Sequence, residues 1–169
     1  MTIVVNDANI LIDLVKLEIL SNFFGLNLRF CTTDLVLEEL HDHQKSALQA
    51  YIVSGQLEVH EISEIQLVDI IQIRLKKPGL SEQDCSAFYQ AEKLNATLLT
   101  SDNTLRKFAK AKKLDVHGHL WVFDQMVAAA TLTPTEAAKK LDELCQTVNP
   151  KLNLPKKECD LRKKKWQNR

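Results

Sequence analysis

Several acidic residues of this 169-residue sequence stand at positions where their carboxylates could meet. Asp7 follows the apolar run Ile3–Val5, and Asp102 follows the run Thr97–Thr100 and one serine. Further acids lie near the expected beginnings of helices: Glu38, Glu39 and Asp84. Carboxylates that are packed together raise one another's pKa values, and a divalent cation relieves that repulsion. Because every donor is a hard oxygen, we expect one or two Mg²⁺ or Mn²⁺ ions at this site.

The elements that position these acids are expected to alternate between strands and helices. Apolar or alternating runs predict strands at 3–5, 28–32, 57–62, 97–100 and 114–117. Apolar residues at helical spacing predict helices at 9–20, 33–53, 63–77, 81–94, 103–113, 120–130 and 133–146. This alternation predicts a three-layer α/β/α sandwich around a mostly parallel sheet of four to five strands. Ligands of such sheets bind beyond the carboxyl ends of the strands, where Asp7 and Asp102 stand.

Length and charge predict one domain with a basic appendage. Basic and acidic residues both number 22, so bulk charge excludes a polybasic nucleic-acid binder. The charge is nevertheless uneven, because residues 156–169 contain seven basic and two acidic side chains. We expect a main domain at 1–130, a helix at 131–148 packed on it, and a flexible basic tail at 149–169. In the helix at 63–77 the side chains expected to face the core are Ile65, Val68, Ile71, Ile73 and Leu75.

The sequence argues against several classes of protein. No apolar run approaches the roughly 18 residues of a membrane span, and the first residues do not resemble a signal peptide. The four cysteines contain no C-x-x-C pair, which favours reduced, buried thiols over a zinc ribbon or redox motif. The four glycines are too scattered for a Walker loop or a dinucleotide fingerprint. A cytoplasmic protein without a membrane partner is therefore expected.

Four segments that contain the acids resemble, in order, the motifs of the PIN domain family, the metal-dependent ribonuclease fold of VapC-type toxins. The first is Asn6-Asp7-Ala8-Asn9-Ile10-Leu11-Ile12-Asp13-Leu14, and the second is Thr32-Thr33-Asp34-Leu35-Val36-Leu37-Glu38-Glu39-Leu40. The third is Leu80-Ser81-Glu82-Gln83-Asp84 with Ala91-Glu92-Lys93-Leu94, and the fourth is Leu98-Leu99-Thr100-Ser101-Asp102. In the second motif the acid directly precedes a leucine, which selects Glu39 over Glu38. The resemblance extends from residue 3 to about residue 123.

This resemblance implies a ribonuclease in which Asp7, Glu39, Asp84 and Asp102 are the catalytic, metal-binding carboxylates. The hydroxyl of Thr100 or Ser101 could orient a ligand or water. Many relatives have a further acid directly after the fourth motif, where this sequence has the neutral Asn103. The resemblance also implies a possible toxin, with an antitoxin whose basic side chain enters the acidic pocket. A homodimer is a further possible assembly.

Basic residues could bring an RNA substrate to this acidic site. Arg106, Lys110 and Lys113 share one face of the expected helix after Asp102, which suits phosphate contacts. The basic tail adds four more candidates, since lysines bind phosphates and a tryptophan can stack on a base: Lys163, Lys164, Lys165 and Trp166. Neither group by itself gives sequence specificity.

Two other functions and several simpler interpretations remain open. A PIN-like fold with weak or no catalysis could be an RNA-binding or scaffold module, which the neutral Asn103 favours. A haloacid-dehalogenase-type phosphatase also has an aspartate after its first strand, but Asn9 stands where its second aspartate is normal. The other acids named and the two histidine pairs are expected to be surface residues: Glu38, Asp13, Asp42, Glu82, His41/His43 and His117/His119. Trp121 and Phe123 are expected in the core.

Overall fold

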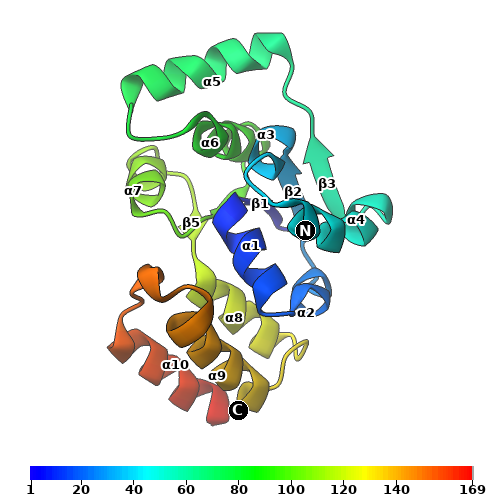
Figure 1. The fold of residues 1–169 in the computed structure, drawn as a ribbon. Coiled ribbons are helices and arrows are strands. Elements are labelled where there is room, and N and C mark those ends of the chain that lie inside the picture. Colours follow the sequence, from blue (N-terminus) through cyan, green and yellow to red (C-terminus); the bar gives the residue numbers. More distant parts are fainter. Residues whose placement is uncertain (169) are drawn as a thin grey trace.

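A computed structural model describes residues 1–168 and contains a five-stranded sheet in the order β3-β2-β1-β4-β5 (Figure 1). The strands are β1 (Ile3–Asn6), β2 (Arg29–Thr33), β3 (Leu57–His60), β4 (Thr97–Leu99) and β5 (Val116–His117). Every pairing is parallel, and Val5 of β1 lies opposite both Cys31 of β2 and Leu98 of β4. The expected α/β fold with a parallel sheet is confirmed.

The order of the strands creates a crevice beside β1. The chain winds outward from β1 to β2 and β3, and it then crosses back to β4 and β5 on the other side. The winding direction therefore reverses between β1 and β4, and a ligand site is expected beyond their carboxyl ends. Asp7 follows β1 directly, and Asp102 follows β4 with only Thr100 and Ser101 between them. The strands are rigidly held there, because Val4, Val5, Leu98 and Leu99 are fully buried.

Helices cover the sheet, and two of the expected helices are each divided. The helices are α1 (Ala8–Lys16), α2 (Leu20–Phe24), α3 (Asp34–Leu37), α4 (Asp42–Val53), α5 (Glu64–Lys76), α6 (Glu82–Leu94), α7 (Asn103–Ala111), α8 (His119–Ala128), α9 (Pro134–Glu143) and α10 (Lys156–Gln167), with short helical segments η1 (Leu144–Val148) and η2 (Pro150–Leu152). Glu18, with a left-handed φ of 58°, separates α1 from α2. The extended backbone of His41, the N-cap of α4, separates α3 from α4. Apolar spacing continues through both interruptions, so it could not locate them.

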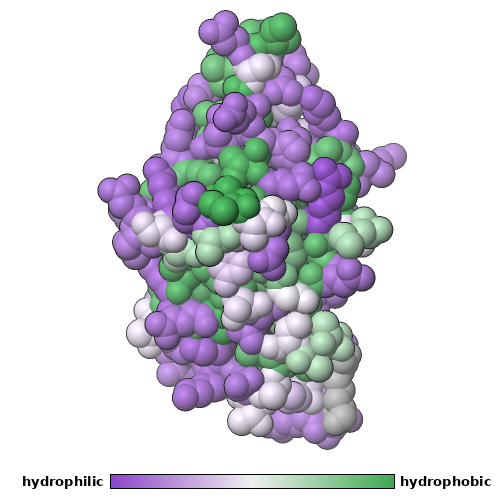
Figure 2. All heavy atoms as spheres, turned by 90° about the vertical axis from the view of Figure 1, so that its right-hand side faces the viewer, coloured by the Kyte–Doolittle hydropathy of each residue, from purple (hydrophilic) through white to green (hydrophobic). Residues whose placement is uncertain are grey.

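The prediction of which α5 side chains face the core is largely wrong. Ile65, Val68 and Leu75 are 81%, 55% and 74% exposed, and Ile70 is the fully buried residue of this helix. α5 packs along α6 rather than on the sheet, so only one side of it has a neighbour (Figure 1). In Figure 2 hydrophobic atoms reach the surface at the upper end of the molecule, where α5 lies. The helix has apolar residues on two sides, and the sequence pattern did not reveal which side is covered.

The C-terminal residues also differ from expectation. Instead of a flexible tail, residues 156–167 form α10, which packs on α8 and α9 (Figure 1). Trp166 is only 1% exposed, its ring centroid lies 6.1 Å from that of Phe123, and its indole Nε1 donates to Asp124 at 2.9 Å. Lysines dominate this segment, so its few apolar residues did not suggest a buried face.

The described residues agree with two of the expected exclusions. No helix within residues 1–168 combines the length and the apolar character that crossing a membrane requires. All four cysteines are free thiols, and Cys31, Cys85 and Cys159 are buried. Burial raises the thiol pKa of Cys31 and Cys85 to about 11, so these thiols are protonated at neutral pH.

Candidate metal centre

Asp7 is the most deeply buried carboxylate of the centre. It caps the N-terminus of α1, where its Oδ1 accepts from the backbone N–H of Ala8 at 2.9 Å. Its Oδ2 accepts from the hydroxyl of Thr100 at 2.7 Å, and the residue is 1% exposed. Burial and the neighbouring charges of Asp84 and Glu39 raise the pKa of Asp7 to about 7, against the opposing effect of its hydrogen bonds. Asp7 is therefore a buried acid that pairs with no positive charge among residues 1–168.

Thr100 connects Asp7 to Asp102. Its hydroxyl donates to Asp7 and also accepts from the backbone N–H of Asp102 at 3.1 Å. Asp102 is the N-cap of α7, and its Oδ1 accepts from the backbone N–H of Leu105 at 2.7 Å. The buried hydroxyl of Thr100 thus fixes the Asp7 side chain, directly after β1, relative to the loop that follows β4. Of the two hydroxyls considered from the sequence, Thr100 contacts the acid directly, whereas Ser101 lines an adjacent cavity.

Asp84 and Glu39 come to this centre from α6 and from the end of α3. Asp84 forms a capping box with Ser81: its Oδ2 accepts from the Ser81 N–H, and its own N–H donates to the Ser81 hydroxyl, each at 3.0 Å. Burial, with the charge of Asp102, raises the pKa of Asp84. Burial, then the charges of Asp84 and Asp102, raises the pKa of Glu39. Both Glu38 and Glu39 are exposed, but Glu38 accepts from Gln83 at 3.4 Å, whereas Glu39 feels the charges of Asp84 and Asp102.

A second pair of hydroxyls holds these two elements together. Thr33 caps α3 by accepting from the N–H of Val36, and its hydroxyl lies 2.7 Å from that of Ser86 on α6. Both residues are fully buried. Sequence reasoning missed Ser86, because nothing local indicates which side of α6 will face α3. This contact joins the helix that precedes Glu39 to the helix that carries Asp84.

The four residues Asp7, Glu39, Asp84 and Asp102, called the acid cluster below, fit a divalent cation. Each of Asp7, Glu39 and Asp84 feels the charge of at least one other member. Within residues 1–168, none of the four forms an ion pair with Lys, Arg or His. Oxygen donors that repel one another and have no cationic side chain are the donor set that Mg²⁺ or Mn²⁺ requires.

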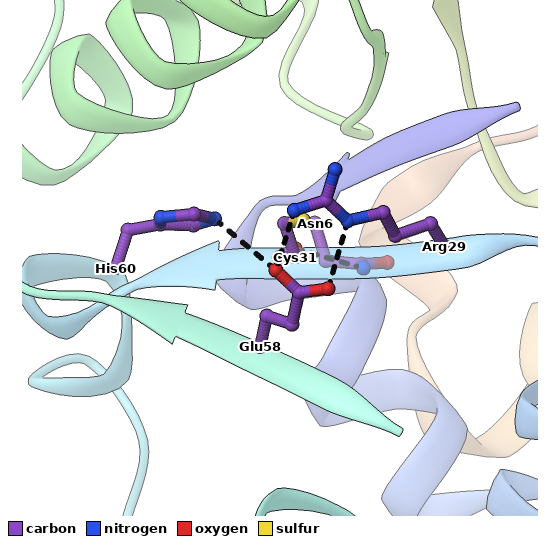
Figure 3. Close-up of polar contacts among 5 residues, drawn as sticks. All are labelled: Asn6, Arg29, Cys31, Glu58 and His60. Carbon is purple, nitrogen blue, oxygen red and sulfur yellow. Dashed lines mark hydrogen bonds and ion pairs between the residues drawn. The ribbon is translucent and has the colours of Figure 1, made fainter. Parts of the chain in front are cut away.

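A second group of metal-ligand types lies elsewhere on the sheet (Figure 3). The Cys31 thiol, the Glu58 carboxylate and the His60 imidazole have ligand atoms within 4.8 Å of one another. Glu58, however, accepts two hydrogen bonds from Arg29, at 2.8 and 2.9 Å. This bidentate pair lowers the pKa of Glu58 and already supplies a positive charge. Within residues 1–168 the acid cluster has no such counter-charge.

The basic residues expected to bind RNA divide into two groups. Arg106 and Lys110 of α7 line a cavity of about 520 Å³ that also includes Ser101 and Asn103, which flank Asp102. Lys113 lies beyond the end of α7, is exposed and does not line this cavity. In α10, Lys164 and Lys165 are exposed, but Lys163 pairs with Asp142. Because Trp166 is buried, the expectation that it stacks on a base is wrong for this structure.

Two residues that were expected at the surface are buried in the interior. Asp13 and His119 are each 3% exposed, and the His119 Nε2 lies 2.8 Å from the Asp13 Oδ2. The Asn149 side chain donates to the same oxygen at 3.0 Å. The cluster therefore joins α1 to the start of α8 and to the segment between η1 and η2. Sequence reasoning missed it because the three residues are far apart in the chain.

Fold and site together define a class: an α/β sandwich with a cluster of hard-oxygen ligands where the sheet changes its winding direction. A family model described as a PIN domain matches residues 3–156, so the chain belongs to the PIN domain family, a nuclease fold. The structure is similar to the crystal structure of PAE2754 from Pyrobaculum aerophilum, with a TM-score of 0.50 and 19% identity over 76% of this chain and 97% of that chain. No curated protein matches the sequence.

Proposed function

We propose that this protein is a ribonuclease that depends on Mg²⁺ or Mn²⁺ and hydrolyses RNA phosphodiesters at the acid cluster. The observation that carries the proposal is the convergence of four carboxylates without a cationic partner among residues 1–168. One or two bound ions would supply Lewis-acid activation of water and neutralise charge on the leaving oxygen. The PIN domain assignment supports nuclease chemistry in general.

The chain's own residues would hold the ligands and attract the substrate. Thr100 fixes the orientation of Asp7, and the capping box with Ser81 fixes that of Asp84. The capping hydrogen bonds of Asp84 and Asp102 each use one carboxylate oxygen, Oδ2 of Asp84 and Oδ1 of Asp102. Within residues 1–168 the second oxygen of each side chain accepts no hydrogen bond, so it is available to bind a metal ion. Arg106 and Lys110, beside Asp102, would attract the phosphate backbone that the acids themselves repel.

The test compares purified full-length protein with its Asp7→Asn variant on single-stranded RNA, with Mn²⁺ or with a chelator. We expect cleavage by the wild type that requires metal, and a loss of cleavage in the variant. Asp42→Asn is the matched control, because Asp42 is exposed on α4 and outside the acid cluster. Equal cleavage by wild type and Asp7→Asn would exclude the acid cluster as the active site.

The alternative is an RNA-binding or scaffold module with weak or no catalysis. The observation that favours it is Asn103, the neutral first residue of α7, at the position where many relatives have another acid. The same assay separates the two functions. RNA that is bound by the wild type but left intact with either metal would support the module and contradict the nuclease.

We further propose that the nuclease acts in the cytoplasm as the toxin of a toxin–antitoxin pair. The antitoxin would insert a basic side chain into the acid cluster, where it would supply the missing positive charge. Expression of the wild type should then arrest growth, and Asp7→Asn should relieve the arrest. Growth that is unaffected by an active enzyme would contradict the toxin role and leave the nuclease activity in place.

A further inference from the structure

A cavity beside the acid cluster combines positive charge with aromatic rings. It has a volume of about 520 Å³, within the usual range for ligand pockets. We call this cavity the basic pocket. Its lining includes four cationic side chains and a tryptophan: Arg106, Lys107, Lys110, Arg162 and Trp121. It is formed by α7, the start of α8 and the segment that leads into α10 (Figure 1). Because Ser101 and Asn103 also line it, the pocket adjoins Asp102.

The cations of α7 are free to bind an anion. Within residues 1–168, Arg106, Lys107 and Lys110 form no ion pair, whereas Arg162 is paired with both Asp124 and Glu158. Arg106 lies against the backbone of Gly118, where an added Cβ would overlap its guanidinium. Glycine at this position therefore allows the guanidinium to sit at the wall of the pocket. A phosphate that bridges Arg106 and Lys110 would satisfy both charges.

The pocket also has a stacked aromatic pair and a buried histidine. The rings of His117 and Trp121 lie 4.9 Å apart with an interplanar angle of 11°, so a nucleobase can extend an existing stack. His119, also in the lining, is almost fully buried, and its Nδ1 has no hydrogen-bond partner within residues 1–168. Its Nε2 lies 2.8 Å from the Asp13 Oδ2, so Nδ1 is the ring nitrogen that has no partner within the described residues, and it is buried beneath the pocket wall.

We propose that the basic pocket binds one unpaired nucleotide of the RNA strand next to the scissile phosphate. Its phosphate would contact Arg106 and Lys110, and its base would stack on Trp121. A base can enter this stack only if it is not held in a duplex, so the substrate is single-stranded at this position. This proposal rests on the proposed nuclease function, but it is tested by binding rather than by cleavage.

The experiment titrates a short single-stranded RNA onto the Asp7→Asn protein in a chelator, so that no cleavage occurs. The chain has two tryptophans, and Trp166 is buried away from the pocket. We therefore expect quenching of fluorescence that survives Trp166→Phe and disappears in Trp121→Phe. Quenching that persists in Trp121→Phe, or none at all while RNA binds by anisotropy, would overturn the proposal.

Affinity measurements with labelled RNA add a second test. Trp121→Ala and Arg106→Ala should each weaken binding about tenfold. Lys112→Ala is the matched control at the end of α7, because Lys112 is exposed and does not line the pocket.

An RNA duplex of the same sequence should also bind about tenfold more weakly. Equal binding by the duplex, or by both pocket variants, would exclude the pocket. Loss of cleavage with intact quenching would instead contradict only the nuclease function.

Discussion

The acid cluster and the basic pocket adjoin at Ser101–Asn103, but they are built in different ways. Asp7, Asp84 and Asp102 are fixed by caps and hydroxyls close to them, and Asp7 is almost inaccessible. The pocket is formed by longer side chains, and Lys107 and Lys110 are exposed. A rigid centre suits ligands that must keep a set geometry, while mobile cations suit a polymer that must bind and leave. The difference implies that chemistry and substrate binding can be separated by mutation.

The largest effect is expected from Asp7→Asn. Cleavage should fall by more than about 100-fold, because loss of an outer-shell partner alone typically costs 10–100-fold. Binding of RNA to the basic pocket should remain, because none of the pocket's cations is changed. Single-turnover cleavage and anisotropy on the same preparation measure both quantities. A variant that lost binding together with cleavage would show that the two regions do not function separately.

The pH dependence of stability should distinguish the acid cluster from the rest of the molecule. The pKa of Asp7 is about 7 in the folded protein and near 3.8 when unfolded. Without metal, folding therefore retains a proton on Asp7, and stability falls as pH rises from about 4 to 7. The contribution of this group is about 1.4 kcal/mol per pH unit over that range.

Denaturant unfolding in a chelator measures this dependence. Asp7→Asn should remove most of the decline, so that the variant is more stable than the wild type at pH 8. Added Mn²⁺ should stabilise the wild type by an amount that grows with the logarithm of its concentration above Kd, and leave Asp7→Asn nearly unchanged. Identical pH profiles for the two proteins would show that Asp7 is not a destabilising buried acid.

Thr100→Val tests whether the connecting hydroxyl matters. The substitution removes a hydrogen bond that lowers the pKa of Asp7, so that pKa should rise further. We expect metal affinity and cleavage to fall by roughly 10–100-fold, with the pH profile of cleavage displaced to higher pH. Calorimetric titration with Mn²⁺ and rates at several pH values measure these effects. An unchanged profile would limit Thr100 to a packing role.

The smallest effect is expected in the basic pocket, from Lys110→Ala. Because one phosphate contact is lost, KM should rise several-fold while kcat stays the same. The slope of log affinity against log salt concentration should decrease by about 0.7. Lys112→Ala again provides the control. A fall in kcat without a change in KM would place Lys110 with the chemistry rather than with the binding.

The positions of Asp7 and Asp84 could be anticipated because each depends on its immediate neighbours. A strand that ends before Asp7, and the Ser81 cap before Asp84, are local patterns, and local backbone geometry then positions the side chain. His119 and Trp166 could not be anticipated in this way. Their partners, Asp13 and Asp124, are remote in the chain, and their burial depends on how α8 and α10 pack.

The sequence by itself determined the five strands, the parallel α/β fold and the acids that we propose bind a metal. These features follow from short-range periodicity and capping, which each segment carries on its own. Only the tertiary structure decided that α10 folds back over α8 and α9, that the outer side of α5 stays exposed, and that Arg106 and Trp121 share a cavity. Burial is a property of a side chain together with whatever packs against it. An apolar or charged residue alone cannot specify that neighbour.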